Sequence, residues 1–377
     1  MSNISYRKGA VSIFVVIFTA LLITIVTVSF VRLMVRDQQR ASDGDLSRSA
    51  YDSAMVGVED AKRALTRYYA NPAAHASVDL SACNAITGLL TGSPSTDEVR
   101  VQTSAAADNQ LNQAYTCVRV YTQTDDYDRA VVADETAMVP LTTPPDVGGS
   151  PRQFDRIRIQ WFIETDLTGA SLNLPASGTS VLSEVWPAGR PPVIEAQLIQ
   201  TNSTFTLDQF DARTGANQNT NTLFLYPKRI AEPTVSFNSD LRQTPKTTVT
   251  DAGCTPTFSE RYLCAITLQV PAPVGGTVGN RSNAYLRLTP RYKGAQVRVT
   301  LYNGPVQPDN LVQFDGVQPR IDSTGRADDL FRRVEVRVES GTNVVYPNAA
   351  ADVSGSFCKT FSLTDRVGDY ARGSCTP

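Results

Sequence analysis

Hydrophobic and polar positions follow two different periods along this chain, and the first of them begins with an unbroken apolar run. Residues 10–31 contain no charged side chain. At 1.5 Å per residue, a helix over this run spans about 33 Å, and the hydrocarbon core of a bilayer is about 30 Å thick. The serine and threonine hydroxyls of the run can bond to carbonyl groups of the preceding helical turn. The run therefore predicts one membrane-spanning helix.

The helical pattern continues beyond the apolar run, because the first proline of the chain is Pro72. From residue 32 to residue 71, apolar residues recur every three or four positions, as expected for one face of an amphipathic helix. This stripe consists of Leu46, Ala50, Ala54, Gly57, Val58, Ala61 and Leu65. Most of its members are small, which favours close packing of the helix on a sheet or on another helix.

The remaining residues, 77–377, alternate with a period of two, which is typical of strands with one buried face. The alternating rows lie at 157–163, 284–289, 295–301, 333–338 and 357–363. Residues Pro290 to Gly294 are expected to connect a hairpin between the second and third rows. The sequence thus predicts an α+β fold, in which a long N-terminal helix packs on a mainly antiparallel β head. About 300 residues allow two β subdomains, and the polar stretch 202–221 is the expected boundary.

The segment from Arg7 to Leu65 resembles the N-terminal region of type IV pilins, and is closest to PilX-like minor pilins and pilus-assembly proteins. The resemblance rests on Lys8-Gly9-Ala10, which open the apolar helix, and on the motif at 50–61 near the end of the amphipathic half. It implies that residues 1–9 are a basic leader, which a prepilin peptidase removes between Gly9 and Ala10. It covers about the first 65 residues.

The same resemblance implies a structural, non-enzymatic function. The helix would first sit in the lipid bilayer, and an inner-membrane assembly platform would then transfer it into or to the tip of an extracellular filament, where it packs against other pilins. Phe14 stands where most pilins have glutamate, which argues against an abundant major pilin. The alternatives are a tip pseudopilin of type II secretion, a membrane-anchored surface adhesin that does not polymerise, and an anchored hydrolase.

Cysteine usage indicates where the head resides, since the basic residues on both sides of the apolar run leave its orientation undecided. The chain has six cysteines, all beyond the apolar run. Fifteen connectivities are open, and a preference for short loops favours the pairs Cys83 with Cys117, Cys254 with Cys264, and Cys358 with Cys375. Disulfides require an oxidising compartment. We therefore expect a cytoplasmic N-terminus and a head outside the cytoplasm.

Charge and motifs exclude some classes of function. The 35 basic and 37 acidic residues nearly balance, so no nucleic-acid partner is predicted. A local basic strip at Arg287, Arg291, Lys293 and Arg298 is better explained as a solvated strand face. The chain has one histidine, His75, and no nucleophile motif, so no catalytic residue is predicted.

One acidic cluster deserves a separate hypothesis. Asp125, Asp126 and Asp128, together with Glu135, offer the oxygen ligands that calcium prefers. The cluster lacks the order of an EF-hand loop, and a solvated loop explains it better. No metal or other cofactor is therefore predicted.

Overall fold

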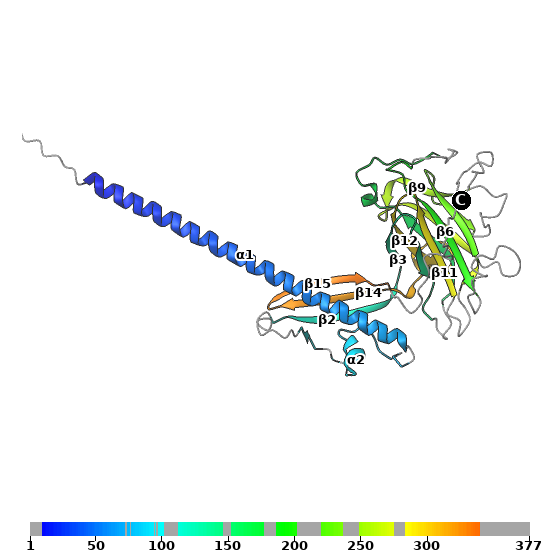
Figure 1. The fold of residues 1–377 in the computed structure, drawn as a ribbon, viewed down its shortest axis with the longest axis horizontal. Helices are drawn as coiled ribbons and strands as arrows, with labels where there is room; N and C mark the ends of the chain where they lie inside the picture. The colour runs from blue at the N-terminus through cyan, green and yellow to red at the C-terminus, as the bar shows by residue number, and fades with distance from the viewer. Residues whose placement is uncertain are drawn as a thin grey trace, which may run out of the picture. The chain divides into compact units, whose positions relative to one another are not determined.

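The computed structural model describes residues 10–71, 74–75, 77–93, 95, 97–101, 112–145, 152–176, 186–201, 220–236, 249–274 and 283–339. The chain forms two compact units. Unit 1 comprises Met1–Val120 and Ile321–Val336, and unit 2 comprises Tyr121–Arg320 and Arg337–Pro377. The α+β class is confirmed: one long apolar helix precedes two sheets whose strand pairs are mostly antiparallel (Figure 1).

The helices and strands have the following bounds. The α-helices are α1 (Ala10–Ala70) and α2 (Ile86–Thr91), and the 3-10 helices are η2 (Glu164–Leu167) and η3 (Pro308–Asn310). The strands are β1 (Val99–Arg100), β2 (Ala114–Thr124), β3 (Tyr127–Val131), β4 (Ala137–Pro140), β5 (Phe154–Trp161), β6 (Val193–Thr201), β7 (Thr220–Lys228), β8 (Thr234–Ser236), β9 (Thr250–Ser259), β10 (Tyr262–Val274), β11 (Asn283–Arg291), β12 (Ala295–Tyr302), β13 (Leu311–Val312), β14 (Phe314–Ala327) and β15 (Leu330–Arg337).

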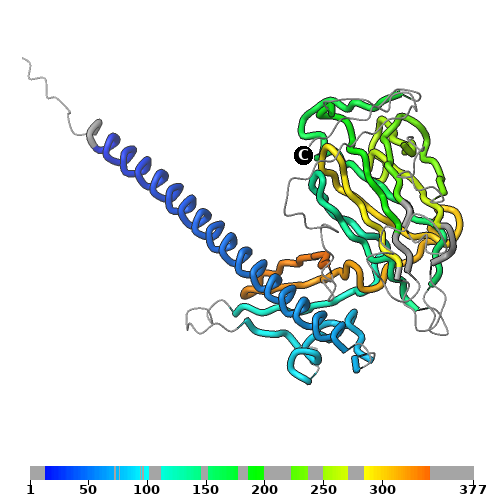
Figure 2. Tube along the Cα trace, turned by 45° about the vertical axis from the view of Figure 1, so that its right-hand side comes forward, coloured from blue at the N-terminus to red at the C-terminus, as the bar shows by residue number. Residues whose placement is uncertain are grey.

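Unit 1 is built from α1, α2 and a sheet in the order β1-β2-β14-β15. Helix α1 extends over 61 residues and ends one residue before the expected position. Its last part lies along β2, β14 and β15 in both views of the chain (Figures 1 and 2). Neighbouring strands β2 and β14 are separated in sequence by nearly all of unit 2, so unit 2 is an insertion into the sheet of unit 1.

Unit 2 contains the larger sheet, in the order β13-β12-β5-β10-β9-β7-β6-β11-β4, with β3 beside β12 and β8 beside β10. Residues from both ends of this order, such as Val299 on β12 and Leu286 on β11, share one hydrophobic core. Trp161, Phe154 and Phe162 are among the large side chains that are fully buried in this core.

The expected hairpin at Pro290–Gly294 is wrong. Strand β11 pairs with β4 and β6, whereas β12 pairs with β3, β5 and β13. Alternation reports which face of a strand is buried and carries no information about its partner. Gly294 is needed for a different reason, because a Cβ there would lie 2.7 Å from the carbonyl oxygen of Val131.

The division between the units falls within β2, β14 and β15 rather than in the stretch 202–221. Strands β6 and β7 flank that stretch and pair with each other from Ile194 to Ile199, so they belong to one sheet. Residues 202–219 lie outside the described residues, as do the strand expected at 357–363 and the last cysteine pair.

Candidate functional site

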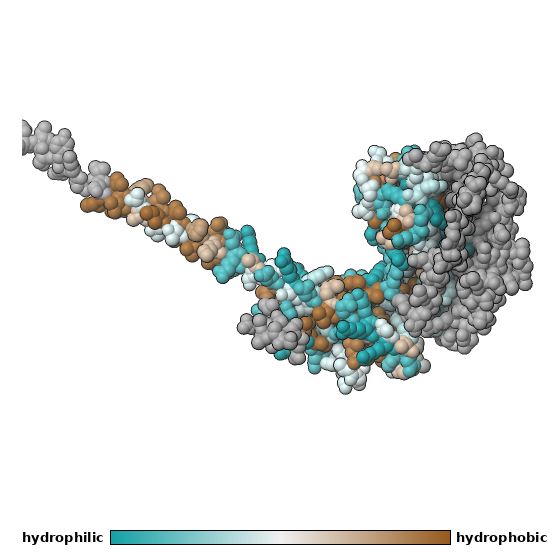
Figure 3. Space-filling model, viewed as in Figure 1, coloured by the Kyte–Doolittle hydropathy of each residue, from teal (hydrophilic) through white to brown (hydrophobic). Residues whose placement is uncertain are grey.

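The first half of α1 presents a continuous exposed apolar surface. From Ile13 to Val35 the large apolar side chains are all exposed, with Phe14 at 74% and Phe18 at 73%. Figure 3 shows this half in brown and the following segment in teal. Such a surface is stable only in lipid or against other apolar surfaces.

The hydroxyl groups described in this half form hydrogen bonds within the helix. The hydroxyls of Thr19, Thr24, Thr27 and Ser29 each donate to the carbonyl oxygen four residues earlier, over 2.5–2.8 Å. No hydroxyl of this set needs water, so the segment can enter hydrocarbon without an unsatisfied donor. Among the described residues, α1 is the one helix long and apolar enough to cross a membrane. The chain therefore carries a membrane anchor.

The second half of α1 buries the small-residue stripe on the sheet of unit 1. Ala50, Ala54, Val58 and Ala61 are fully buried. The backbones approach so closely that a Cβ on Gly325 of β14 would lie 2.2 Å from the carbonyl oxygen of Ala50. Small residues on the helix and glycine on the strand are both required for this contact.

Three polar contacts join the helix to this sheet, and the most exposed is the bond from Arg332 on β15 to the hydroxyl of Ser47 at 2.8 Å. Ser323 on β14 donates its hydroxyl to the carbonyl oxygen of Ala54 at 2.7 Å, inside the buried contact. Tyr115 on β2 donates to the carboxylate of Asp60 at 3.1 Å. Burial, and secondly the charge of Asp60, raise the pKa of Tyr115 well above its ordinary value, so the phenol stays a donor.

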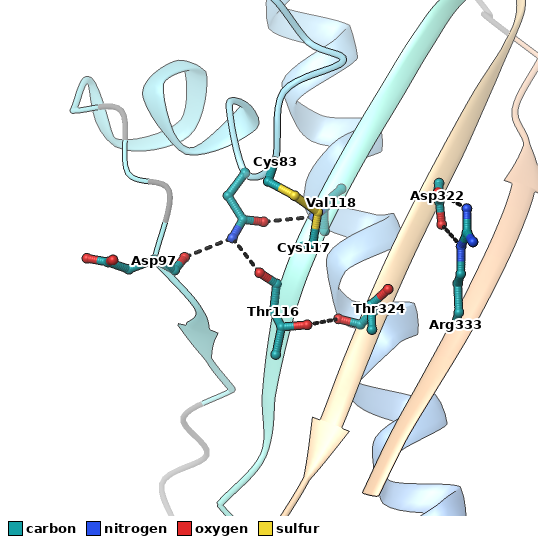
Figure 4. The surroundings of a disulfide bond; sticks show 9 residues. Cys83, Asp97, Thr116, Cys117, Val118, Asp322, Thr324 and Arg333 are labelled. Atoms are coloured by element: carbon teal, nitrogen blue, oxygen red, sulfur yellow. Dashed lines mark hydrogen bonds and ion pairs between the residues drawn. A yellow bond between two sulfur atoms is a disulfide. The ribbon is translucent and has the colours of Figure 1, made fainter. Parts of the chain in front are cut away.

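The segment after α1 is fastened to β2. A disulfide joins Cys83 to Cys117, and Figure 4 shows it beside the backbone of β2. Next to it, the buried Asn84 accepts from the amide of Val118 at 2.8 Å. Its own amide donates to the carbonyl oxygens of Asp97 at 2.8 Å and Thr116 at 3.1 Å. These bonds replace regular secondary structure in a segment that has little of its own.

The second disulfide lies in unit 2, where Cys254 on β9 faces Cys264 on β10. Both bonds in the described part of the chain are therefore pairs that short loops favour. Cys358 and Cys375 lie outside the described residues.

The acidic cluster is engaged by protein partners. Asp126 accepts from Arg298 at 2.7 Å and from Arg337 at 2.6 Å. Asp128 accepts from the hydroxyl of Tyr262 at 2.8 Å, and Asp125 from Gln313 at 2.9 Å. In the described residues no group of His, Cys, Asp or Glu side chains is arranged to hold a metal ion.

The proposed basic strip does not form one surface. Its residues lie on β11, on β12 and between them, and those two strands are not paired. Arg291 bonds to Glu195 at 2.5 Å and to Asp134 at 2.9 Å. Lys293 donates to backbone carbonyls of Asp166 and Ala188. Their charges are thus used inside unit 2.

A feature that the sequence analysis missed is an aromatic cluster on unit 2. The rings of Trp186 and Tyr292 are stacked at 4.5 Å with an angle of 2°, and the guanidinium of Arg190 lies 5.2 Å from the Trp186 ring. Tyr292 remains 46% exposed. Residues 186 and 292 are far apart in sequence, so no local pattern could have joined them.

Comparison with known proteins adds no family. The chain matches no protein-family model, no curated protein and no solved structure. The features that bear on function are therefore the helix, the sheet on which it packs and the inserted unit 2.

Two residues named from the sequence remain. Gly9, which the resemblance places at the cleavage site, lies outside the described residues. His75 is a half-buried residue shortly after α1.

Proposed function

We propose that this protein is a minor pilin or a pilus-assembly component, anchored by α1 in the membrane and then incorporated into or at the tip of an extracellular filament. One observation carries the proposal: a single uninterrupted helix joins an exposed apolar half to a half whose small residues are buried on a sheet. The first half suits lipid and then a bundle of similar helices, because its hydroxyls are internally bonded. The second half holds the folded unit to the anchor.

Processing of the N-terminus tests this proposal. Mass spectrometry of the mature protein should find a chain that begins at an N-methylated Ala10. The variant Gly9→Val should keep its leader and disappear from sheared filaments, while Asn3→Val, in the same leader, should be processed normally. A wild-type chain that retains Met1, with filament content unaffected by Gly9→Val, would leave a plain membrane anchor. A processed chain that stays in the periplasm with a secretion apparatus would favour the type II tip pseudopilin.

A second candidate, a surface-binding protein, is favoured by the aromatic cluster. An exposed ring such as Tyr292, stacked on Trp186, offers a flat face on which a sugar or another planar ligand can pack. In this hypothesis unit 2 binds the ligand, and unit 1 attaches it to the membrane anchor. Tyr292→Ala should then lower adherence of cells to a glycan-coated surface without changing the amount of membrane-bound protein, and unchanged adherence would remove the candidate.

A further inference from the structure

Three arginines follow the apolar half of α1 on one face of the helix. Arg32, Arg36 and Arg40 are spaced by four residues, which places them above one another along the helix. All three are exposed. In the part of the chain that the structure describes, no carboxylate lies within ion-pair distance of any of them. Farther along the same helix the pattern differs, because Lys62 pairs with Glu59 at 2.6 Å and Arg63 with Asp60 at 3.4 Å.

This arginine row, defined as Arg32, Arg36 and Arg40, points to the same side as the buried stripe. Ala50 follows Arg32 by 18 residues, as Ala54 follows Arg36. Eighteen residues are about five helical turns, so each pair has the same direction around the axis. The row therefore lies on the sheet-facing side of α1, between the apolar half and the sheet of unit 1.

The position of the row along α1 identifies what surrounds it. Arg32 stands among exposed apolar side chains, between Val31 and Leu33, at the end of the apolar half. A long arginine side chain at this depth extends its guanidinium toward the lipid headgroups while its methylenes stay in apolar surroundings. The three arginines span about 12 Å along the axis, which covers the headgroup region of one leaflet.

The positive charge of the row favours lipid headgroups that carry a net negative charge. Asp37 and Asp43 are each three residues from Arg40, but neither forms an ion pair with the row in the structure, and three arginines against two aspartates leave this segment with a net positive charge. A guanidinium binds a phosphate through two parallel hydrogen bonds and attracts a net negative charge. We propose that the arginine row binds the phosphates of anionic phospholipids in the leaflet where α1 leaves the membrane. This proposal requires only the membrane anchor, and the failure of the pilin proposal would leave it intact.

Selective lipid association tests the proposal. The full chain is reconstituted in vesicles of phosphatidylglycerol and phosphatidylcholine in equal parts, and electron paramagnetic resonance of spin-labelled forms of each lipid gives their relative association. Wild type should prefer phosphatidylglycerol, and one basic residue at an anionic surface contributes about a fivefold effect. The variant Arg32→Gln/Arg36→Gln/Arg40→Gln should lose at least about fivefold of this preference. Replacing all three with lysine should retain part of it, because the charge remains while the bidentate geometry is lost.

The matched control is Arg48→Gln/Lys62→Gln/Arg63→Gln, which removes the same charge from α1 beyond the row. It should keep the wild-type preference. Equal association of both lipids with wild type would overturn the proposal, as would an equal loss in the control. The alternative ligand of the row is a second copy of this chain, and energy transfer between labelled copies measures that self-association. If the row binds acidic residues of a second copy, the three glutamine substitutions will lower self-association and leave the lipid preference unchanged, which would overturn the proposal.

Discussion

Replacing Gly57 with alanine should loosen α1 from the sheet of unit 1. A Cβ at this position would lie 2.5 Å from Ser323 Oγ and 2.7 Å from Val118 Cγ2. Overpacking of this kind costs about 1–3 kcal/mol. Ser323 cannot move away freely, because its hydroxyl bonds to Ala54, and loss of that bond costs about 1 kcal/mol more. Alanine is about 1 kcal/mol more favourable than glycine inside a helix, and this gain offsets part of the cost. We therefore expect a net loss of about 1–3 kcal/mol.

The matched control is Gly44→Ala in the same helix. No atom lies within 4 Å of a Cβ built at Gly44, so only the gain in helix propensity remains. Hydrogen exchange, measured by mass spectrometry on the full chain in detergent, reports local opening of α1 over residues 50–65. For Gly57→Ala the expected loss corresponds to exchange about fivefold to a hundredfold faster than in wild type. For Gly44→Ala exchange should be equal or slower.

The comparison of the two variants decides whether close packing holds the helix. If Gly57→Ala exchanges at the wild-type rate, the close approach at this position is not required. If both variants slow exchange equally, helix propensity alone determines the stability of α1. Either result would refute the packing argument, and with it the role of the small-residue stripe.

Three further predictions concern the contacts of β2. Asn84→Ala removes three hydrogen bonds to backbone groups, one buried and two partly buried, and places alanine at a φ of 55°, so unit 1 should lose about 2–4 kcal/mol by urea unfolding. Asn84→Gly, free of the backbone strain, should lose less, and equal losses would show that strain contributes nothing. Replacing Cys83 and Cys117 by serine opens a loop of 34 residues and should lower stability by about 3–4 kcal/mol, whereas no change in the unfolding midpoint would mean that the bond is dispensable. Because burial raises the pKa of Tyr115, the unfolded chain releases the phenolic proton first, so stability should fall as pH rises above about 10. In Tyr115→Phe the free energy of unfolding should fall less as pH rises. If its dependence on pH equals that of wild type, the assignment of this loss to Tyr115 is wrong.

Local periodicity predicted those parts of the fold that depend on neighbours in sequence. The first proline, Pro72, located the end of α1 to within one residue, and the 3.6-residue period identified its buried stripe, since both depend only on neighbours along one helix. The period of two located β5, β11, β12 and β15 for the same reason. Cys254 and Cys264 are close in sequence, and the hairpin of β9 and β10 brings them together.

Periodicity failed where a residue's surroundings come from distant segments. Gln160 alternates with apolar residues and was expected on the wet face of its strand, yet it is 2% exposed. Glu260, in the turn between β9 and β10, accepts a hydrogen bond from Gln160 at 3.3 Å and forms an ion pair with Arg158 on β5. The pairing of β2 with β14 could not be predicted either, because no local sequence pattern links two strands that flank an inserted unit.

The insertion of unit 2 between two neighbouring strands leaves unit 1 able to fold on α1. Unit 2 leaves the sheet of unit 1 at Val120 and returns at Ile321, on two strands that are neighbours in that sheet. An insertion between neighbouring strands leaves the helix-to-sheet contact of unit 1 intact, because none of the residues that make this contact belongs to unit 2. Substitutions in the two units should therefore act independently. A substitution in unit 2, at Tyr292 for example, should therefore leave the contact between the small-residue stripe of α1 and the sheet of unit 1 unchanged.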